Sequence, residues 1–355
     1  MNVPALAYLN SWEATTSVGE SALETEILWR AGISNVALSR FIDAQGDRVR
    51  MCFSPAVPAD VLGVERMARL ADLALGRLQR SLLDKRHQPS RPALLVALPE
   101  RFDAPAGEPP SAQVETLLKA LRACLAPPWQ GATIEPFPFG RAGGALALQR
   151  ASLLLEEGRA VIWGGVDSQY DWSVLEALAK ADRLLGVDNV DGVRPGEGAA
   201  FVLLERPGRG QGGLSVLGFG VGQERHPVGH ETPSMALGLT HALDAALDPL
   251  RRTGRRSNYW LLDNTHEVYA TQQLQNIITR FSDVIGLEAV LHTPLKDLGD
   301  VGAAAIPLLA VLAAQAWNLG HTDDDVMVLT GCSDGGARGA VLLAGSDSFN
   351  QGEAR

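Results

Sequence analysis

The chain has 355 residues, 46% of them hydrophobic and 20% charged, a balance that excludes long disordered segments and is typical of a globular α/β protein. Its net charge of −10 argues against nonspecific binding to nucleic acids or anionic membranes. The three cysteines, Cys52, Cys124 and Cys332, are scattered without CxxC spacing, so they indicate neither a disulfide framework nor a zinc site and favour a reducing cytoplasm.

The first predicted elements are a strand and a helix. Residues 4–9 form a short apolar run, which predicts a strand. Residues 21–31 then place Leu23, Ile27 and Leu28 at helical spacing, which predicts an amphipathic helix with these three side chains turned inward.

The next predicted elements are a long helix, a buried strand and a capped helix. Residues 67–83 carry apolar side chains at helical spacing, and residues 93–98 form an apolar strand stopped by Pro99. Ser111 can cap a helix that runs to Leu125, because its hydroxyl can accept a hydrogen bond from an unpaired amide at the helix start.

Two glycine-rich motifs occupy the middle of the chain. Residues 140–146 read GRAGGAL and open a predicted helix, which leads into a strand over 160–163 and a turn over 164–168 that reads GGVDS. After a further helix, residues 191–200 read DGVRPGEGAA and precede a strand over 201–205.

A glycine- and arginine-rich segment over 206–213 predicts a linker, so we divide the chain into an N-terminal half, 1–212, and a C-terminal half, 213–355, of one compact unit. The alanine-rich run 301–317 contains Pro307 and is short for a membrane span, so it predicts a buried central helix. The other predicted elements of this half are strands over 214–222, 259–263, 326–330 and 340–344, and helices over 234–250 and 269–281.

The order of these elements and the two glycine motifs resemble the centre of a β-ketoacyl synthase, the condensing-enzyme branch of the thiolase superfamily. The resemblance implies an α/β, thiolase-like fold, in which two pseudo-repeated halves with mixed sheets sandwich buried helices. The alternation of strands and helices itself predicts a largely parallel sheet covered on both faces.

In that family a cysteine starts the first central helix and carries the acyl chain, and the matching residue here is Arg141. Arginine is not nucleophilic and stays protonated. Its charge at the positive end of a helix is unfavourable unless a carboxylate, for which Glu135 is a candidate, or a bound anion neutralises it. We therefore expect a structural or partner-facing arginine. The alternative is an anion site, since the backbone amides of Arg141 and Cys332 match the family's oxyanion hole.

The other catalytic positions of the family are replaced as well. The first histidine matches Thr265, with His266 one place later, and a one-residue shift at a strand end turns a side chain to the other face. The second histidine follows the lysine that matches Lys296 and corresponds to Asp300, which cannot donate the hydrogen bond that stabilises an enolate. We expect Asp300 to pair with Lys296 or with the arginine at the helix start. Cys332 lies in a turn where thiolases carry a catalytic cysteine, and a small buried thiol is the expectation, with a reactive thiol as the alternative.

These replacements remove nucleophile, base and oxyanion donor together, so the resemblance implies a catalytically inactive protein that acts by binding another protein. One extension is an adaptor or chaperone in a bacterial effector secretion system, such as type VI secretion. The alternatives are an acyltransferase or thioesterase that uses Cys332, His266 or Asp300, and an inactive chain-length-factor-like subunit of a condensing-enzyme heterodimer. We expect no cofactor, metal, nucleic acid or membrane. The expected partner is an effector or a condensing-enzyme paralogue, in a homo- or heterodimer in the cytoplasm.

Overall fold

The computed structural model describes residues 3–43, 46–85, 89, 91–103, 111–208 and 213–345. Ten strands form one mixed sheet in the order β10-β9-β11-β12-β8-β1-β7-β6-β4-β5. Their bounds are β1 Ala7–Thr15, β4 Ala93–Ala97, β5 Thr133–Phe137, β6 Val161–Ser168, β7 Glu197–Glu205, β8 Leu214–Gln223, β9 Ser257–Leu261, β10 Ile285–His292, β11 Val326–Cys332 and β12 Ala337–Gly345.

The sheet repeats one strand order in its two halves. In the N-terminal half, which contributes β1 and β4 to β7, the third strand lies at the edge and is followed by the second, fourth, fifth and first strands of that half. The C-terminal half, β8 to β12, has the same order, and the two first strands, β1 and β8, pair where the halves meet. Residues 209–212, in the predicted linker, lie outside the described residues.

The prediction of a largely parallel sheet is wrong. Of the nine strand pairs described in the sheet, four are parallel and five are antiparallel. The reason is that the last strand of each half, β7 or β12, runs antiparallel to both of its neighbours. For example, β12 follows β11 after a tight turn, which can join only antiparallel strands.

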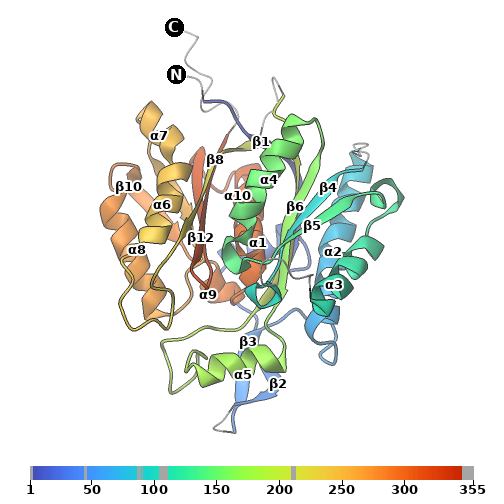
Figure 1. Cartoon of the computed structure of the whole chain (residues 1–355), viewed down its shortest axis with the longest axis vertical. Helices are drawn as coiled ribbons and strands as arrows, with labels where there is room; N and C mark the ends of the chain where they lie inside the picture. The colour runs from blue at the N-terminus through green and yellow to red at the C-terminus, as the bar shows by residue number, and fades with distance from the viewer. Residues whose placement is uncertain are drawn as a thin grey trace.

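Helices cover the sheet in three groups (Figure 1). The central helices α4 and α10 lie between the two halves of the sheet, and α1 packs against α10. Helices α2 and α3 cover the outer face of the N-terminal half, and α6 and α8 cover that of the C-terminal half. The helix bounds are α1 Ala22–Arg30, α2 Gly63–Asp84, α3 Ala112–Ala123, α4 Gly143–Glu156, α5 Trp172–Lys180, α6 Leu237–Ala246, α7 Asp248–Thr253, α8 Val268–Arg280, α9 Leu295–Leu298 and α10 Ala305–Leu319.

The central pair of helices depends on small residues at their contact. A Cβ atom at Gly144 would lie 2.8 Å from Pro307 Cδ, so α4 approaches α10 this closely only because the residue is glycine. The segment Gly302–Leu319 is long and apolar enough to span a membrane, but 83% of it is buried inside the molecule. The prediction of a buried central helix is therefore confirmed.

Two further details of the prediction hold and one does not. Ser111 caps α3, with its hydroxyl accepting a hydrogen bond from the Val114 amide at 3.3 Å. The strands β11 and β12, which match the predicted strands over 326–330 and 340–344, pair in an antiparallel hairpin. The predicted turn over 164–168 is instead the end of β6, where Gly164 lies against Phe201 and a Cβ atom would collide with its ring.

The predicted inward face of α1 is also wrong. Leu23 and Ile27 are 46% and 45% exposed, whereas Glu26 is fully buried. The Glu26 carboxylate pairs with Arg30 and lies 3.0 Å from His321 Nδ1, and these partners compensate the loss of hydration. Hydrophobic periodicity cannot detect a helix that buries a paired charge.

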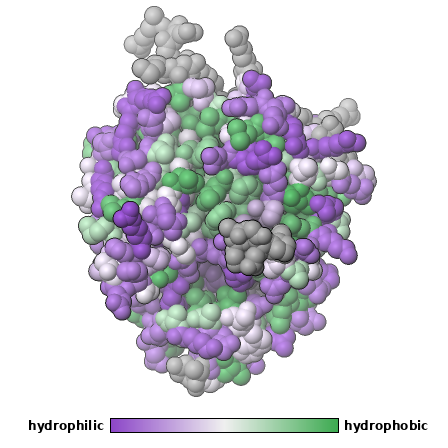
Figure 2. Space-filling view, in the orientation of Figure 1, coloured by the Kyte–Doolittle hydropathy of each residue, from purple (hydrophilic) through white to green (hydrophobic). Residues whose placement is uncertain are grey.

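A small layer at one end of the molecule was not predicted. Strands β2 (Val36–Ile42) and β3 (Arg48–Cys52) form a separate hairpin, which packs on α5 through the buried side chains of Phe41 and Leu175. In Figure 1 this layer lies below the sheet. In the same orientation, hydrophilic residues cover most of the face, with hydrophobic residues gathered around α4 (Figure 2).

Candidate functional site

The two central helices begin in the same way and meet at their starts. Each is preceded by one turn of 3-10 helix, η3 (Gly140–Ala142) before α4 and η4 (Gly302–Ala304) before α10. Each turn begins on a glycine with positive φ, +57° at Gly140 and +49° at Gly302, a conformation that other residues adopt only with strain. Arg141 follows the first of these glycines, and Asp300 precedes the second by two residues.

Arg141 is held by two carboxylates. Its Nε donates to Asp300 Oδ1 at 2.9 Å, its Nη2 donates to the other oxygen of the same carboxylate, and its Nη1 donates to Asp334 Oδ1 at 3.2 Å. Nη1 also donates to the Cys332 carbonyl oxygen at 2.9 Å. Burial lowers the pKa of Arg141, but the Asp300 and Asp334 charges raise it by more. The net pKa is above the usual value, so the guanidinium stays charged. Glu135, the predicted neutralising carboxylate, pairs with Arg150 instead.

Each oxygen of the Asp300 carboxylate accepts two hydrogen bonds. Besides Arg141, its carboxylate accepts hydrogen bonds from Gln169 Nε2 at 2.7 Å and from the Gly302 amide at 3.0 Å, at the positive end of the η4–α10 helix. Burial alone would raise the pKa of Asp300, but the Arg141 charge lowers it below its usual value. Of the two predicted partners, Arg141 is the one found. Lys296 is not among the partners that the described residues provide.

A second arginine extends the ion network. Arg183, in the segment after α5, binds both oxygens of Glu267 at 2.7 and 3.1 Å and both oxygens of Asp334 at 2.8 and 3.2 Å. Thr265, which was predicted to match the family's first histidine, donates its hydroxyl to Glu267 Oε2 at 3.1 Å. Asp334 therefore joins Arg141 to Arg183, and both Thr265 and Asp300 contact the network.

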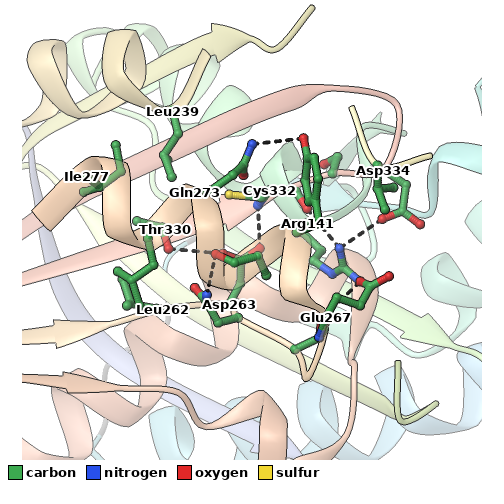
Figure 3. A pocket seen from close by; sticks show the side chains of 17 residues that line it. Arg141, Leu239, Leu262, Asp263, Glu267, Gln273, Ile277, Thr330, Cys332 and Asp334 are labelled. Atoms are coloured by element: carbon green, nitrogen blue, oxygen red, sulfur yellow. Dashed lines mark hydrogen bonds and ion pairs between the residues drawn. The ribbon is translucent and has the colours of Figure 1, made fainter. Parts of the chain in front are cut away.

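Cys332 is not placed as a nucleophile (Figure 3). Its backbone amide donates to Asp263 Oδ2 at 2.5 Å, and Thr330 donates its hydroxyl to Asp263 Oδ1 at 3.1 Å. Burial and the Asp263 carboxylate raise the pKa of the Cys332 thiol well above its usual value, which disfavours the reactive thiolate. The Asp263 carboxylate therefore already binds the Cys332 amide, one of the two amides of the predicted anion site.

The space behind Arg141 is small. The cavity has a volume of about 30 Å³, and its walls include Leu239, Leu262 and Ile277 together with Thr265 and Cys332. Ligand pockets usually measure about 300–1,000 Å³. The cavity has room for one or two water molecules and not for an acyl chain.

His266 lies apart from the ion network. Its Nε2 is 3.3 Å from the Lys296 carbonyl oxygen, and His266 does not line the cavity, whereas Thr265 does. Burial lowers the pKa of His266, so its ring is mostly neutral near pH 7. The structure therefore brings Arg141, Asp300, Thr265 and Cys332 together and leaves His266 and Lys296 outside.

Six contributors to the site escaped the sequence analysis: Gln169, Arg183, Asp263, Glu267, Ser333 and Asp334. Ser333 Oγ accepts a hydrogen bond from the Ala142 amide at 2.9 Å and fixes the β11–β12 turn to the start of the central helix. Gln169 directly follows the GGVDS motif, which was the one available signal. Arg183 has no local signal, because its partners lie 84 and 151 positions away in the chain.

The fold is similar to that of solved condensing enzymes. The ishigamide ketosynthase/chain length factor is matched with a TM-score of 0.67 and 17% identity, over 95% of this chain and 99% of that one. A ketosynthase in complex with its chain length factor from Xenorhabdus doucetiae is matched with a TM-score of 0.71 and 15% identity, over 97% and 98%. A type II polyketide synthase ketosynthase in complex with its acyl-carrier protein gives 0.72 and 13%, over 96% and 99%.

No protein-family model and no curated protein matches the chain by sequence. The structural similarity shows that the chain has the thiolase-like fold of ketosynthases and chain length factors, so the predicted fold is confirmed. At 12–17% identity the similarity shows the fold alone.

Proposed function

We propose that this protein is a non-condensing subunit with a ketosynthase fold, which works by binding a condensing-enzyme paralogue that retains the catalytic cysteine. The observation that carries the proposal is the ion network of Arg141, Asp300, Asp334, Arg183 and Glu267 at the start of the central helix. A condensing site needs an activated thiolate there.

The network supports a protein that holds its shape rather than one with altered acyl chemistry. Its carboxylates and guanidinium groups are paired with one another, so none of the five is left as an unpaired general acid or base. The cavity of about 30 Å³ leaves no room for an acyl group beside Cys332. An acyltransferase or thioesterase that uses Cys332, His266 or Asp300 is therefore the weaker alternative.

The structural neighbours favour a paralogue as the partner. Two of the solved structures contain a ketosynthase and a chain length factor. In each, the match extends over nearly the whole of this chain and of the matched chain. The adaptor or chaperone role in effector secretion stays a prediction, for which neither the fold nor the site adds support.

The surface also offers apolar side chains that a protein partner could cover. Leu38 and Ile42 on β2 and Trp172 on α5 are 57%, 55% and 50% exposed. Ile42 and Trp172 line a groove of about 430 Å³ between the β2–β3 hairpin and α5, and Leu38 lies on the same strand as Ile42. Clustered exposed apolar residues are typical of interaction surfaces.

The test is to co-express the chain with a cysteine-bearing ketosynthase paralogue from the same genome and to measure the mass of the complex by light scattering during size-exclusion chromatography. We expect a stable hetero-oligomer that contains both chains in equal amounts. Separate elution of the two proteins at micromolar concentration would contradict the proposal.

Matched cysteine variants locate the chemistry within the complex. If the complex condenses acyl units, replacing the paralogue's catalytic cysteine by alanine should abolish the product. Cys332→Ser in this chain should leave product formation unchanged, because the Cys332 thiol is partly buried and its pKa is raised well above the usual value, which keeps it protonated near pH 7. A loss of product with Cys332→Ser, while the hetero-oligomer still forms, would favour an enzymatic role for this chain.

A further inference from the structure

A larger cleft shares Arg141 and Asp334 with the narrow cavity. It has a volume of about 430 Å³, within the range of ligand sites. One wall is the apolar side of α5, where Val174 and Leu178 are half-buried. The opposite wall is polar and includes Glu100, of the 3-10 turn Glu100–Phe102.

The cleft has more negative than positive charge. The side chains that line it include four carboxylates and three guanidinium groups: Glu100, Asp167, Asp300, Asp334, Arg101, Arg141 and Arg183. Each arginine is already paired, since Arg101 binds Asp167 at 3.1 Å and the other two belong to the ion network. Glu267, the second partner of Arg183, raises the surplus to two negative charges.

Glu100 is the carboxylate of the cleft that lacks an ion pair, although the Arg141 charge lowers its pKa. Its oxygens accept hydrogen bonds from the Gly335 amide at 3.0 and 3.2 Å, and no ion pair with it occurs among the residues that the structure describes. Burial and the Asp334 charge raise the pKa of Glu100. A positive group bound at this point would relieve that repulsion.

Gln169 provides an independent second observation. This side chain lines the cleft and only 8% of the residue is exposed. Its Nε2 donates to Asp300, but its Oε1 is buried without a donor in the described part of the chain. An unpaired buried acceptor costs free energy, and a ligand with N–H groups would supply the missing donor.

We propose that this cleft binds an alkylammonium or alkylguanidinium group, with its positive head between Glu100 and the amide oxygen of Gln169 and its aliphatic stem against α5. The charge surplus selects a cation over an anion, and the apolar wall of Val174 and Leu178 selects an organic cation over a metal ion. The site goes beyond the proposed function, and binding a protein partner does not depend on it.

The experiment is a titration of the full chain with butylammonium and butylguanidinium, followed by ligand-observed NMR and thermal shift. Butanol and butyrate serve as the neutral and the negative probes of equal length. We expect saturable binding of the cations at millimolar concentration or below and no saturation by either control probe. Equal binding of butanol, or no saturation by either cation up to about 10 mM, would overturn the proposal.

Variants test the two named residues. Glu100→Gln keeps an acceptor for the Gly335 amide and removes the charge, so it should weaken cation binding about tenfold or more while the thermal midpoint without ligand stays close to that of the wild type. Gln169→Leu removes the unpaired acceptor and should also weaken binding.

Glu288→Gln is the matched control, since Glu288 is exposed on β10 and does not line the cleft. Unchanged affinity in Glu100→Gln, or an equal loss in Glu288→Gln, would show that general surface charge binds the probe. Neither result would bear on the hetero-oligomer, so the two proposals can fail separately.

Discussion

The starts of the two central helices share a backbone and differ in their side chains. The turns η3 and η4 both begin on a glycine with positive φ and both lead into a buried helix. At the second position of the turn, however, the N-terminal half carries Arg141 and the C-terminal half carries Ala303. A carboxylate from elsewhere approaches each start. Asp300 binds the Arg141 side chain, whereas Asp167 accepts a hydrogen bond from the Ala303 amide at 3.1 Å.

This difference shows that the fold does not require a particular side chain at the helix start. It requires the glycine, the tight turn and a partner for the exposed amides of the helix end. The second position carries a guanidinium group in one turn and a methyl group in the other, and Asp300 compensates the charge of the guanidinium group. The two starts therefore keep the same backbone with different side chains.

Arg141→Ala should change the stability of the protein most. It gives the start of the N-terminal central helix the same Gly-Ala-Ala sequence as the start of the C-terminal one. We expect a loss of about 3–5 kcal/mol in the free energy of unfolding, because Asp300 is left buried without its counter-ion. Urea denaturation at pH 7 measures this loss. Arg150→Ala is the control, since its pair with Glu135 is about one-third exposed and solvent screening should make its loss much smaller. Equal losses in the two variants would contradict the account.

Removing both Arg141 and Asp300 measures the coupling between the two side chains. The double variant Arg141→Ala/Asp300→Ala should lose less stability than the sum of the two single variants, with a coupling free energy of about 2 kcal/mol or more. The double variant should still be less stable than the wild type, because Gln169 and the Gly302 amide lose their acceptor. Additive losses, within about 0.5 kcal/mol, would mean that the pair is not coupled.

The other helix start should respond less. Asp167→Asn keeps an acceptor for the Ala303 amide and weakens only the pair with Arg101, whose side chain is 33% exposed. Burial raises the pKa of Asp167, although the Arg101 charge and the Ala303 amide lower it. We expect a loss of about 1 kcal/mol or less in the same denaturation measurement. A loss as large as that of Arg141→Ala would remove the contrast between the two starts.

The smallest expected effect is a pH dependence at Asp334. Burial raises the pKa of this carboxyl, but Arg141 and Arg183 lower it further, to about 2. Because the folded pKa is below the unfolded one, the charged carboxylate stabilises the fold above about pH 4, and this contribution is lost as the pH falls towards 2. The stability difference between the wild type and Asp334→Asn should therefore be constant from pH 5 to 7 and shrink below pH 4. The side chain is 43% exposed, so solvent keeps the effect modest. A difference that grows on acidification would contradict the assignment.

The sequence carried enough information for the fold and for part of the site. The order of elements, the glycine motifs and the Ser111 cap could be predicted because each depends on residues close together in the chain. The Arg141–Asp300 pair was one of two predicted pairings, and only the three-dimensional structure chooses between them. Arg183 and the buried face of α1 could not be predicted, since both depend on charges paired across the fold.

The decisive experiment is to measure the intact mass of the chain after incubation with acyl-CoA and with an acylated carrier protein. We expect an unchanged mass, because Arg141 cannot be acylated and the partly buried Cys332 thiol has a raised pKa and no room for an acyl group beside it. A covalent acyl adduct that disappears in Cys332→Ser would contradict it and would show that the chain has kept acyl-transfer chemistry.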